Sequence, residues 1–171
     1  AGTICFVLPI SGCHANESAV PLPARSTPSH PAITSPSPTA TNVTAVTEAY
    51  TQFTAILDRA DRIPEHTRKQ ELSMYMVEPQ LSRVLNRIRD LNTKGLTAYG
   101  SAIMNITDVH IDGNDATVHD CQDTRSAGLM KIATKEKITR GLPEVRIKTY
   151  LVKGQDGRWR VSKAVALGEG C

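Results

Sequence analysis

The feature that most constrains the fold is a change in the spacing of apolar residues near residue 95. Before it, apolar side chains recur every three or four residues, as in helices that pack by one face. They are Val43, Val46, Tyr50, Phe53, Ile56 and Leu57, then Leu72, Met76, Leu81, Val84, Leu85, Ile88 and Leu91. From Leu96 on, apolar and polar residues alternate, as in strands with one buried face. We therefore expect helices first and strands afterwards.

Prolines and glycines set the expected bounds of these elements. Pro64 ends the first helix, Pro79 divides the second helical stretch, and Gly95 ends it. Hairpin turns are expected at 111–115 and 154–157. The expected strands are 96–111, 115–124, 128–134, 143–153 and 158–167. This order predicts an α+β fold, in which N-terminal helices pack on a curved antiparallel sheet.

A segment rich in proline, serine and threonine, residues 14–42, precedes the helices. It holds six of the ten prolines and almost no large hydrophobic side chains. Such a segment cannot bury enough surface to offset its chain entropy, so we expect a disordered, extended tether. The remaining residues, 43–171, are enough for one domain and too few for two.

Residues 1–13 contain a short apolar run that ends in Ile10-Ser11-Gly12-Cys13. The run is about half as long as a membrane-spanning helix and has the length of a signal-peptide core. Its last four residues resemble the lipobox of bacterial lipoproteins, in which the cysteine is lipidated. The resemblance implies a signal peptide, an acyl (palmitate) anchor on Cys13 and a location on the extracellular face of the cell membrane. The alternative is an apolar tail with a chance cysteine.

Two segments of the second half carry a further resemblance. Residues 115–123, Asp-Ala-Thr-Val-His-Asp-Cys-Gln-Asp, and residues 157–161, Gly-Arg-Trp-Arg-Val, resemble strands of small secreted actinobacterial lipoproteins. Together with the order of helices and strands, they are similar to the NTF2-like (SnoaL-like) superfamily. The resemblance implies a cone-shaped domain over residues 43–171. It implies little about activity, because this superfamily contains enzymes, transport factors and assembly subunits.

The four cysteines differ in their context. Cys5 lies in the expected signal peptide and Cys13 in the lipobox, which leaves Cys121 in an expected strand and Cys171 after the last one. Outside the cytosol, we expect Cys121 and Cys171 to form a disulfide. A reactive thiol or a metal ligand is the alternative, although no CxxC pair and no Cys or His cluster has zinc-site spacing. No metal and no cofactor is predicted.

Candidate cavity residues follow from the family resemblance. NTF2-like enzymes similar to ketosteroid isomerases and dehydratases use Asp or His as acid–base groups in the cavity of the cone. By position, the polar residues considered are Tyr99, Asp108, His110, His119, Asp120 and Asp123. Of these, Tyr99, Asp108 and His119 are the candidate cavity residues. Each is also explained as a surface or structural polar group, so no catalytic residue is assigned.

The charge balance gives no indication of a nucleic-acid partner. The chain has 20 Lys and Arg and 17 Asp and Glu, of which only Arg25 and Glu17 precede residue 43. The resulting excess is small and forms no strongly basic run. Several basic residues between Arg125 and Lys148 fit either a solvated sheet face or a docking surface for an acidic partner.

Two functions remain open. The leading prediction is a lipid-anchored cell-envelope protein with a non-catalytic binding or assembly domain that contacts another envelope protein. An exclusion lipoprotein carried by a phage or plasmid is one version of it. The alternative is a small-molecule-binding protein or a cavity enzyme of the ketosteroid isomerase or dehydratase type, which requires an open apolar pocket.

Overall fold

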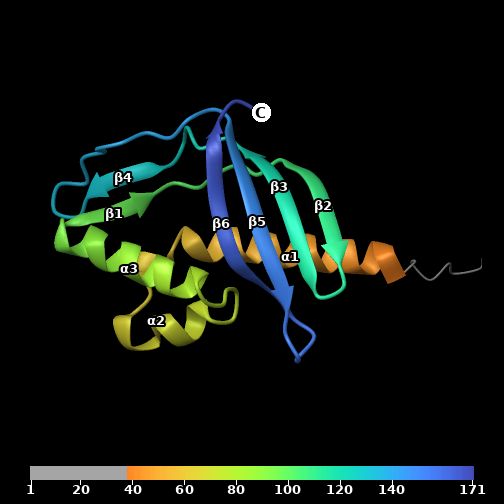
Figure 1. The fold of residues 1–171 in the computed structure, drawn as a ribbon. Coiled ribbons are helices and arrows are strands. Elements are labelled where there is room, and N and C mark those ends of the chain that lie inside the picture. Colours follow the sequence, from red (N-terminus) through yellow and green to blue (C-terminus); the bar gives the residue numbers. More distant parts are fainter. Residues whose placement is uncertain (1–37) are drawn as a thin grey trace, which may run out of the picture. The chain divides into compact units, whose positions relative to one another are not determined.

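The computed structural model describes residues 38–171, and in this range the expected helices-then-strands order is confirmed (Figure 1). The helices are α1 (Pro38–Leu57), the 3-10 helix η1 (Ala60–Arg62), α2 (Glu65–Leu72) and α3 (Gln80–Thr93). The strands are β1 (Leu96–Tyr99), β2 (Ile106–Asp112), β3 (Asp115–Gln122), β4 (Gly128–Lys131), β5 (Val145–Lys153) and β6 (Trp159–Glu169). Residues 1–37, with the expected signal peptide, the candidate lipidation site Cys13 and most of the expected tether, lie outside the described residues.

The main sheet is antiparallel, with the strand order β2-β3-β5-β6. Val118 on β3 lies opposite Val109 on β2 and Thr149 on β5. Along β3 the buried residues are Ala116, Val118 and Asp120, so these side chains point to the inner face of the sheet. Helix α1 crosses the sheet (Figure 1) and contacts β2, β3 and β6.

The core lies between α1 and the inner face of this sheet. The predicted stripe of α1 is buried at Val46, Tyr50, Phe53 and Ile56, each at most 2 % exposed. It packs with buried side chains of α2, of the loop after it and of the strands, which include Leu72, Met76, Val118, Leu151, Trp159 and Val161. Burial of each large apolar side chain contributes about 1.5–3 kcal/mol. The helical periodicity of the sequence therefore identifies the face of α1 that holds the sheet.

The single strand expected over residues 96–111 is wrong, because two strands in two different sheets share this stretch. β1 pairs with β4 in a separate two-stranded sheet, and β2 pairs with β3. Gly100, just after β1, has φ +70°, and a Cβ there would lie 1.9 Å from the carbonyl oxygen of Ser126. Only glycine fits this close approach, so the chain turns here and leaves the first sheet.

The second helical stretch divides at Pro79, as predicted, and the residues before it extend the edge of β6. The Val161 N–H donates to the carbonyl of Tyr75 over 3.0 Å, and the Val77 N–H donates to the carbonyl of Val161 over 2.9 Å. The Ala164 N–H donates to Oε1 of Gln80, the first residue of α3, over 3.1 Å. These bonds fix the start of α3 against β6.

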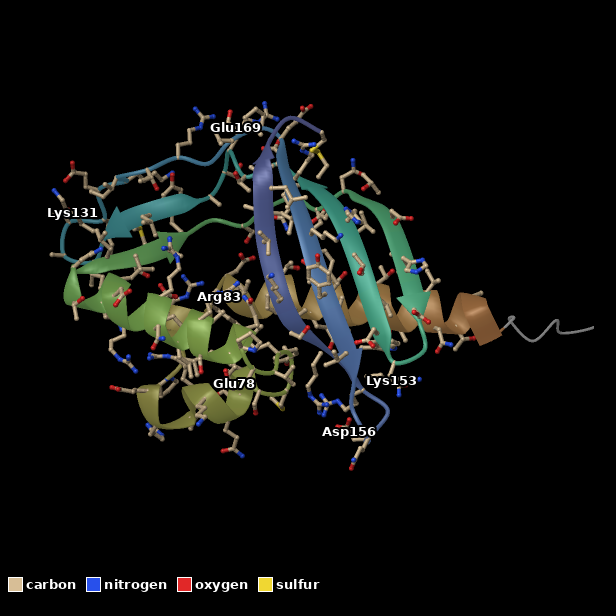
Figure 2. The ribbon with its side chains drawn as sticks, viewed as in Figure 1. Glu78, Arg83, Lys131, Lys153, Asp156 and Glu169 are labelled. Carbon is tan, nitrogen blue, oxygen red and sulfur yellow. A yellow bond between two sulfur atoms is a disulfide. The ribbon has the colours of Figure 1, made fainter. Side chains whose placement is uncertain are left out.

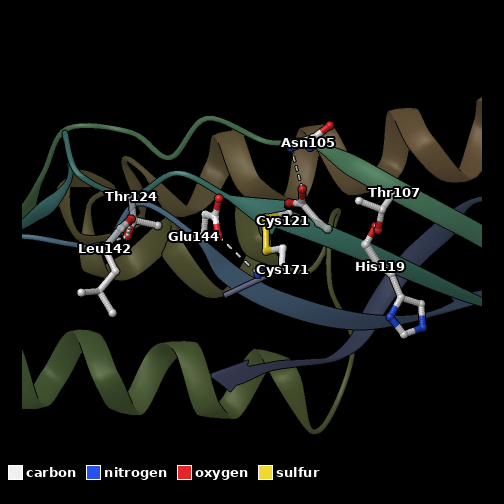
Figure 3. Close-up of a disulfide and its surroundings, with 9 residues drawn as sticks. Asn105, Thr107, His119, Cys121, Thr124, Leu142, Glu144 and Cys171 are labelled. Carbon is white, nitrogen blue, oxygen red and sulfur yellow. Dashed lines mark hydrogen bonds between the residues drawn. A yellow bond between two sulfur atoms is a disulfide. The ribbon is translucent and has the colours of Figure 1, made fainter. Parts of the chain in front are cut away.

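The structure contains the expected disulfide between Cys121 and Cys171 (Figure 3). The two Cα atoms are 6.0 Å apart, although 50 residues separate them in sequence. Glu144, which precedes β5, helps to hold the tail, because its carbonyl accepts the Gly170 N–H over 3.0 Å. Its carboxylate also accepts the Cys171 N–H over 3.5 Å. The disulfide therefore joins the end of β3 to the segment that follows β6.

Candidate ligand cavity

A cavity of about 670 Å³ lies between α1 and the inner face of β5 and β6. This volume is within the range of sites that take small organic ligands, about 300–1,000 Å³. Its lining is mostly apolar: Tyr50, Phe53, Thr54, Leu57, Asp58, Arg87, Ala102, Gln122, Ile147, Thr149, Ala164, Val165 and Ala166. On β6 the lining includes the small residues Ala164 and Ala166, and larger side chains at these positions would fill the cavity.

A polar network lies at one wall of this cavity. The Tyr50 hydroxyl donates to Oδ2 of Asp120 over 2.7 Å, and Nε2 of Gln122 donates to the Tyr50 oxygen over 3.0 Å. The other carboxylate oxygen of Asp120 accepts the N–H of Asn105 over 2.7 Å (Figure 3). Asp120 is only 3 % exposed, and each of its two carboxylate oxygens has a hydrogen-bond donor. The network ties α1 to β3 and to the residue that precedes β2.

Tyr50 is held in its neutral form. Burial raises the pKa of the Tyr50 hydroxyl well above its usual value, and the hydrogen bond to the Asp120 carboxylate raises it further. Gln122 and Thr149 oppose this shift of the pKa without cancelling it. At physiological pH, Tyr50 is therefore a hydroxyl group that binds by hydrogen bonding and does not act as a base.

Thr149 contributes a buried hydroxyl to the lining of the cavity. It is fully buried on β5, and its hydroxyl makes no hydrogen bond of ordinary geometry with the described residues, although it lies near enough to the Tyr50 hydroxyl to oppose the rise of that group's pKa. A buried hydroxyl without a partner costs about 1–3 kcal/mol. A ligand with a carbonyl or hydroxyl group would supply the missing partner.

The three candidate cavity residues from the sequence do not line this cavity. The Tyr99 hydroxyl, on β1, donates to the carbonyl of Thr139 over 2.8 Å, and the Lys137 ammonium lies 4.6 Å from its ring centre. Asp108 and His119 are paired neighbours on β2 and β3. His119 lies between the inward-facing Val118 and Asp120, so both His119 and Asp108 are on the outer face.

The other polar residues considered also have structural surroundings. His110 is exposed on β2, and Asp123 forms an ion pair with Arg125 with 2.5 Å between Oδ2 and Nη2. Asp120 is the one that contributes to a wall of the cavity, through Tyr50. The sequence contains one signal for the Tyr50–Asp120 pair. Asp120 alternates in step with Ala116 and Val118 along the expected strand, so it belongs to the same buried face, and a buried carboxylate needs hydrogen-bond donors.

The described residues contain no group of three or more His, Cys, Asp or Glu side chains placed to hold a metal ion. Within residues 38–171, no helix is both long enough and apolar enough to cross a membrane.

Comparison with known proteins places the fold. No family model matches the chain, and no curated protein is significantly similar to it in sequence. Among solved structures, it is similar to an NTF2-like superfamily protein from Salmonella enterica serovar Typhimurium, with a TM-score of 0.52 and 12% identity over 78% of this chain and 94% of that one.

Two further structures superpose less closely. A protein from Kribbella flavida has a TM-score of 0.49 and 19% identity over 77% of this chain and 95% of its own. A ketosteroid isomerase-like protein from Erwinia carotovora atroseptica has a TM-score of 0.48 and 11% identity over 74% of this chain and 97% of its own. At such identities, structural similarity shows the fold and not the activity. The domain has the NTF2-like fold, with helices packed on a curved antiparallel sheet.

Proposed function

We propose that this domain binds a small, largely apolar ligand in the cavity between α1 and the sheet, without catalysing a reaction. The observation that carries the proposal is the cavity itself: about 670 Å³, apolar over most of its lining, with the buried Thr149 among the residues that line it. Apolar walls with one or two placed polar groups are typical of small-molecule sites. The ligand is a neutral molecule with a carbonyl or hydroxyl group that pairs with Thr149.

Binding is favoured over catalysis by the state of the polar network. A general base needs a free lone pair within reach of the substrate. Asp120 does not itself line the cavity, and the hydrogen bonds from Tyr50 and Asn105 hold its carboxylate away from a ligand there. Tyr50 keeps its proton because burial and Asp120 raise its pKa. These groups are therefore suited to shape the wall and orient a ligand.

We also propose that the chain is lipid-anchored through Cys13 at the extracellular face of the cell membrane and binds its ligand there. The support is the sequence Ile10-Ser11-Gly12-Cys13 and the proline-rich segment after it. The disulfide between Cys121 and Cys171 suits an oxidising compartment. Binding of a second envelope protein is a separate proposal, which gains weight if the cavity takes no ligand.

Cavity binding is tested with a neutral apolar fluorescent probe, 1-N-phenylnaphthylamine, and two variants of the full chain. Ala166→Phe adds a large ring at a residue that lines the cavity, whereas Leu167→Phe changes the next residue of β6, which does not line it and is 50 % exposed. We expect Ala166→Phe to weaken probe binding at least tenfold and Leu167→Phe to leave it unchanged. Absence of saturable binding, or an equal effect of both variants, would overturn the proposal.

The anchor is tested separately by cell fractionation. The full chain and its Cys13→Ser variant are expressed in a bacterial host that processes lipoproteins. We expect the parent in the membrane fraction and the variant outside it. If the variant stays with the membrane to the same extent, the anchor proposal is wrong, while the cavity proposal stands on its own test.

A further inference from the structure

A second pocket, of about 270 Å³, lies beside α3, between this helix, the end of α1 and β1. Its walls are aliphatic at Leu57, Ala60, Val84, Ile88, Leu91 and Ala98. Four polar residues complete the lining, namely Asp61, Gln80, Arg83 and Arg87. A pocket of this size and lining takes a molecule with an apolar part no larger than a few carbon atoms.

Asp61 lines this pocket, and one of its two carboxylate oxygens has no partner among the described residues. Oδ2 accepts hydrogen bonds from the Thr97 hydroxyl and, over 3.0 Å, from the Ala98 N–H. These two bonds hold the carboxylate in a fixed orientation against β1. Oδ1 is buried and has no hydrogen-bond donor among the described residues. A buried carboxylate oxygen is strongly favoured to take a donor, and a charged ammonium is the strongest one.

The same pocket carries two guanidinium groups without acidic partners. Arg83 and Arg87 are one helical turn apart on α3, and both line the pocket. The guanidinium of Arg83, labelled in Figure 2, makes a single hydrogen bond with the described residues, to the carbonyl of Ala164 over 3.5 Å. Within residues 38–171, the guanidinium of Arg87 forms no ion pair and no hydrogen bond. Two exposed guanidinium groups on one face favour a carboxylate, which Arg binds with two parallel bonds.

We propose that this pocket binds a free α-amino acid with an aliphatic side chain. The ammonium group meets Oδ1 of Asp61, the carboxylate meets Arg87 or Arg83, and the side chain lies on the aliphatic wall. An amine alone would leave the arginines without an anion, and a carboxylate alone would leave Oδ1 without a donor. The zwitterion satisfies both, and the aliphatic lining selects the side chain.

The first experiment compares three ligands by titration calorimetry on the full chain. L-leucine carries both charges, 4-methylpentanoate lacks its ammonium group, and 3-methylbutylamine lacks its carboxylate. We expect leucine to bind at least tenfold more tightly than either fragment. If leucine binds no more tightly than the fragments, or if none of the three binds, the proposal is wrong.

The second experiment assigns the charges with matched variants. We expect Asp61→Asn to weaken leucine binding about tenfold and to leave binding of 4-methylpentanoate unchanged, because only the ammonium contact is lost. We expect Arg87→Gln to weaken leucine and 4-methylpentanoate but not 3-methylbutylamine. Asp90→Asn is the control for Asp61→Asn, and Arg89→Gln is the control for Arg87→Gln. Each control removes the same charge as its partner variant, at a residue of α3 that does not line this pocket. Equal effects of controls and pocket variants would overturn the assignment.

Folding of the variants is followed by the amide signal of Ala98 in NMR spectra, because this N–H bonds to Asp61. If Asp61→Asn loses that signal, the decision rests on Arg87→Gln and on the three-ligand comparison. The filled-cavity variant Ala166→Phe should bind leucine as the parent does, since Ala166 lies only in the larger cavity. Failure of leucine binding is thus distinguishable from failure of the proposed function.

Discussion

The Tyr50 hydroxyl and the Asp120 carboxylate are joined by a 2.7 Å hydrogen bond, although 70 residues separate them. This bond connects the buried face of α1 to the inner face of β3. Tyr50→Phe removes the donor and leaves Oδ2 of Asp120 buried without one. We expect the free energy of unfolding to fall by about 1–3 kcal/mol, measured by urea denaturation at pH 7.

Tyr75→Phe is the matched control for this prediction. Tyr75 is half-buried against the same core, and its hydroxyl makes no hydrogen bond with the described residues. The free energy of unfolding should change by no more than about 0.5 kcal/mol. Equal losses in the two variants would mean that the bond to Asp120 contributes nothing specific.

The Tyr50 hydroxyl also predicts how stability responds to alkaline pH. Because burial and Asp120 raise its pKa in the folded protein, an unfolded chain releases this proton first, near pH 10. The stabilisation by neutral Tyr50 is complete below that pH and is lost as the pH rises further. The difference in unfolding free energy between the parent and Tyr50→Phe should therefore shrink from pH 8 to pH 11. A constant difference over this range would contradict the raised pKa.

Asp156, at the β5–β6 turn (Figure 2), predicts a response at acid pH. The hydrogen bonds from the Arg160 guanidinium lower the pKa of this carboxyl to about 2, with help from the Arg158 N–H. Its contribution to stability is present above the unfolded pKa, about 3.9, and is lost as the pH falls toward 2. In Arg160→Gln, the carbon-13 signal of the Asp156 carboxyl should titrate closer to pH 4.

Asp123 is the internal control for that titration. The hydrogen bond from Arg125 lowers its pKa to about 2 as well, and Arg160 takes no part. Arg160→Gln should leave the Asp123 midpoint in place. A parent in which Asp156 already titrates near pH 4 would show that Arg160 does not hold it in solution.

The disulfide predicts a large loss of stability on its removal. The Cys121–Cys171 bond closes a loop of 50 residues, which corresponds to about 4 kcal/mol in the chain-entropy model. We expect the double variant Cys121→Ser/Cys171→Ser to unfold at clearly lower urea concentration than the oxidised parent. Mass spectrometry of the unfolded, unreduced parent after thiol alkylation should find neither cysteine labelled. Alkylation of both would exclude the bond.

Two glycines in the left-handed region should differ in their tolerance of alanine. Gly113, in the β2–β3 turn, has φ +57°, and no atom lies within 4 Å of the place that a Cβ would occupy. Gly113→Ala should therefore lower the free energy of unfolding by backbone strain alone, about 1–2 kcal/mol. Gly100 has φ +70°, and an added Cβ would lie 1.9 Å from the Ser126 carbonyl oxygen. In Gly100→Ala, overpacking should therefore destabilise the fold by about 1–3 kcal/mol beyond the backbone strain. Thermal unfolding should rank Gly100→Ala below Gly113→Ala; the reverse order would contradict the close approach at Gly100.

Local patterns predict most of this fold and little of its cavity. The stripe of Val46, Tyr50 and Phe53 identifies the buried face of α1, because helical spacing and burial are directly linked. The break at Gly100 depends on the approach of Ser126, a contact distant in sequence that no local pattern contains. The hydrogen bond between Tyr50 and Asp120 is also distant in sequence, because it forms only when α1 crosses β3. The candidates Tyr99, Asp108 and His119, chosen by position from the family resemblance, lie elsewhere in the fold.

The bonds that join β6 to residues 75–77 and to Gln80 decide where the main sheet can grow. An edge strand with free N–H and C=O groups is a template for another strand. On β6, Val161 is paired with Tyr75 and Val77, and both backbone groups of Ala164 contact side chains of α3. β2 is the other edge of the four-stranded sheet. Of the two edges, β2 is therefore the better template for a further strand.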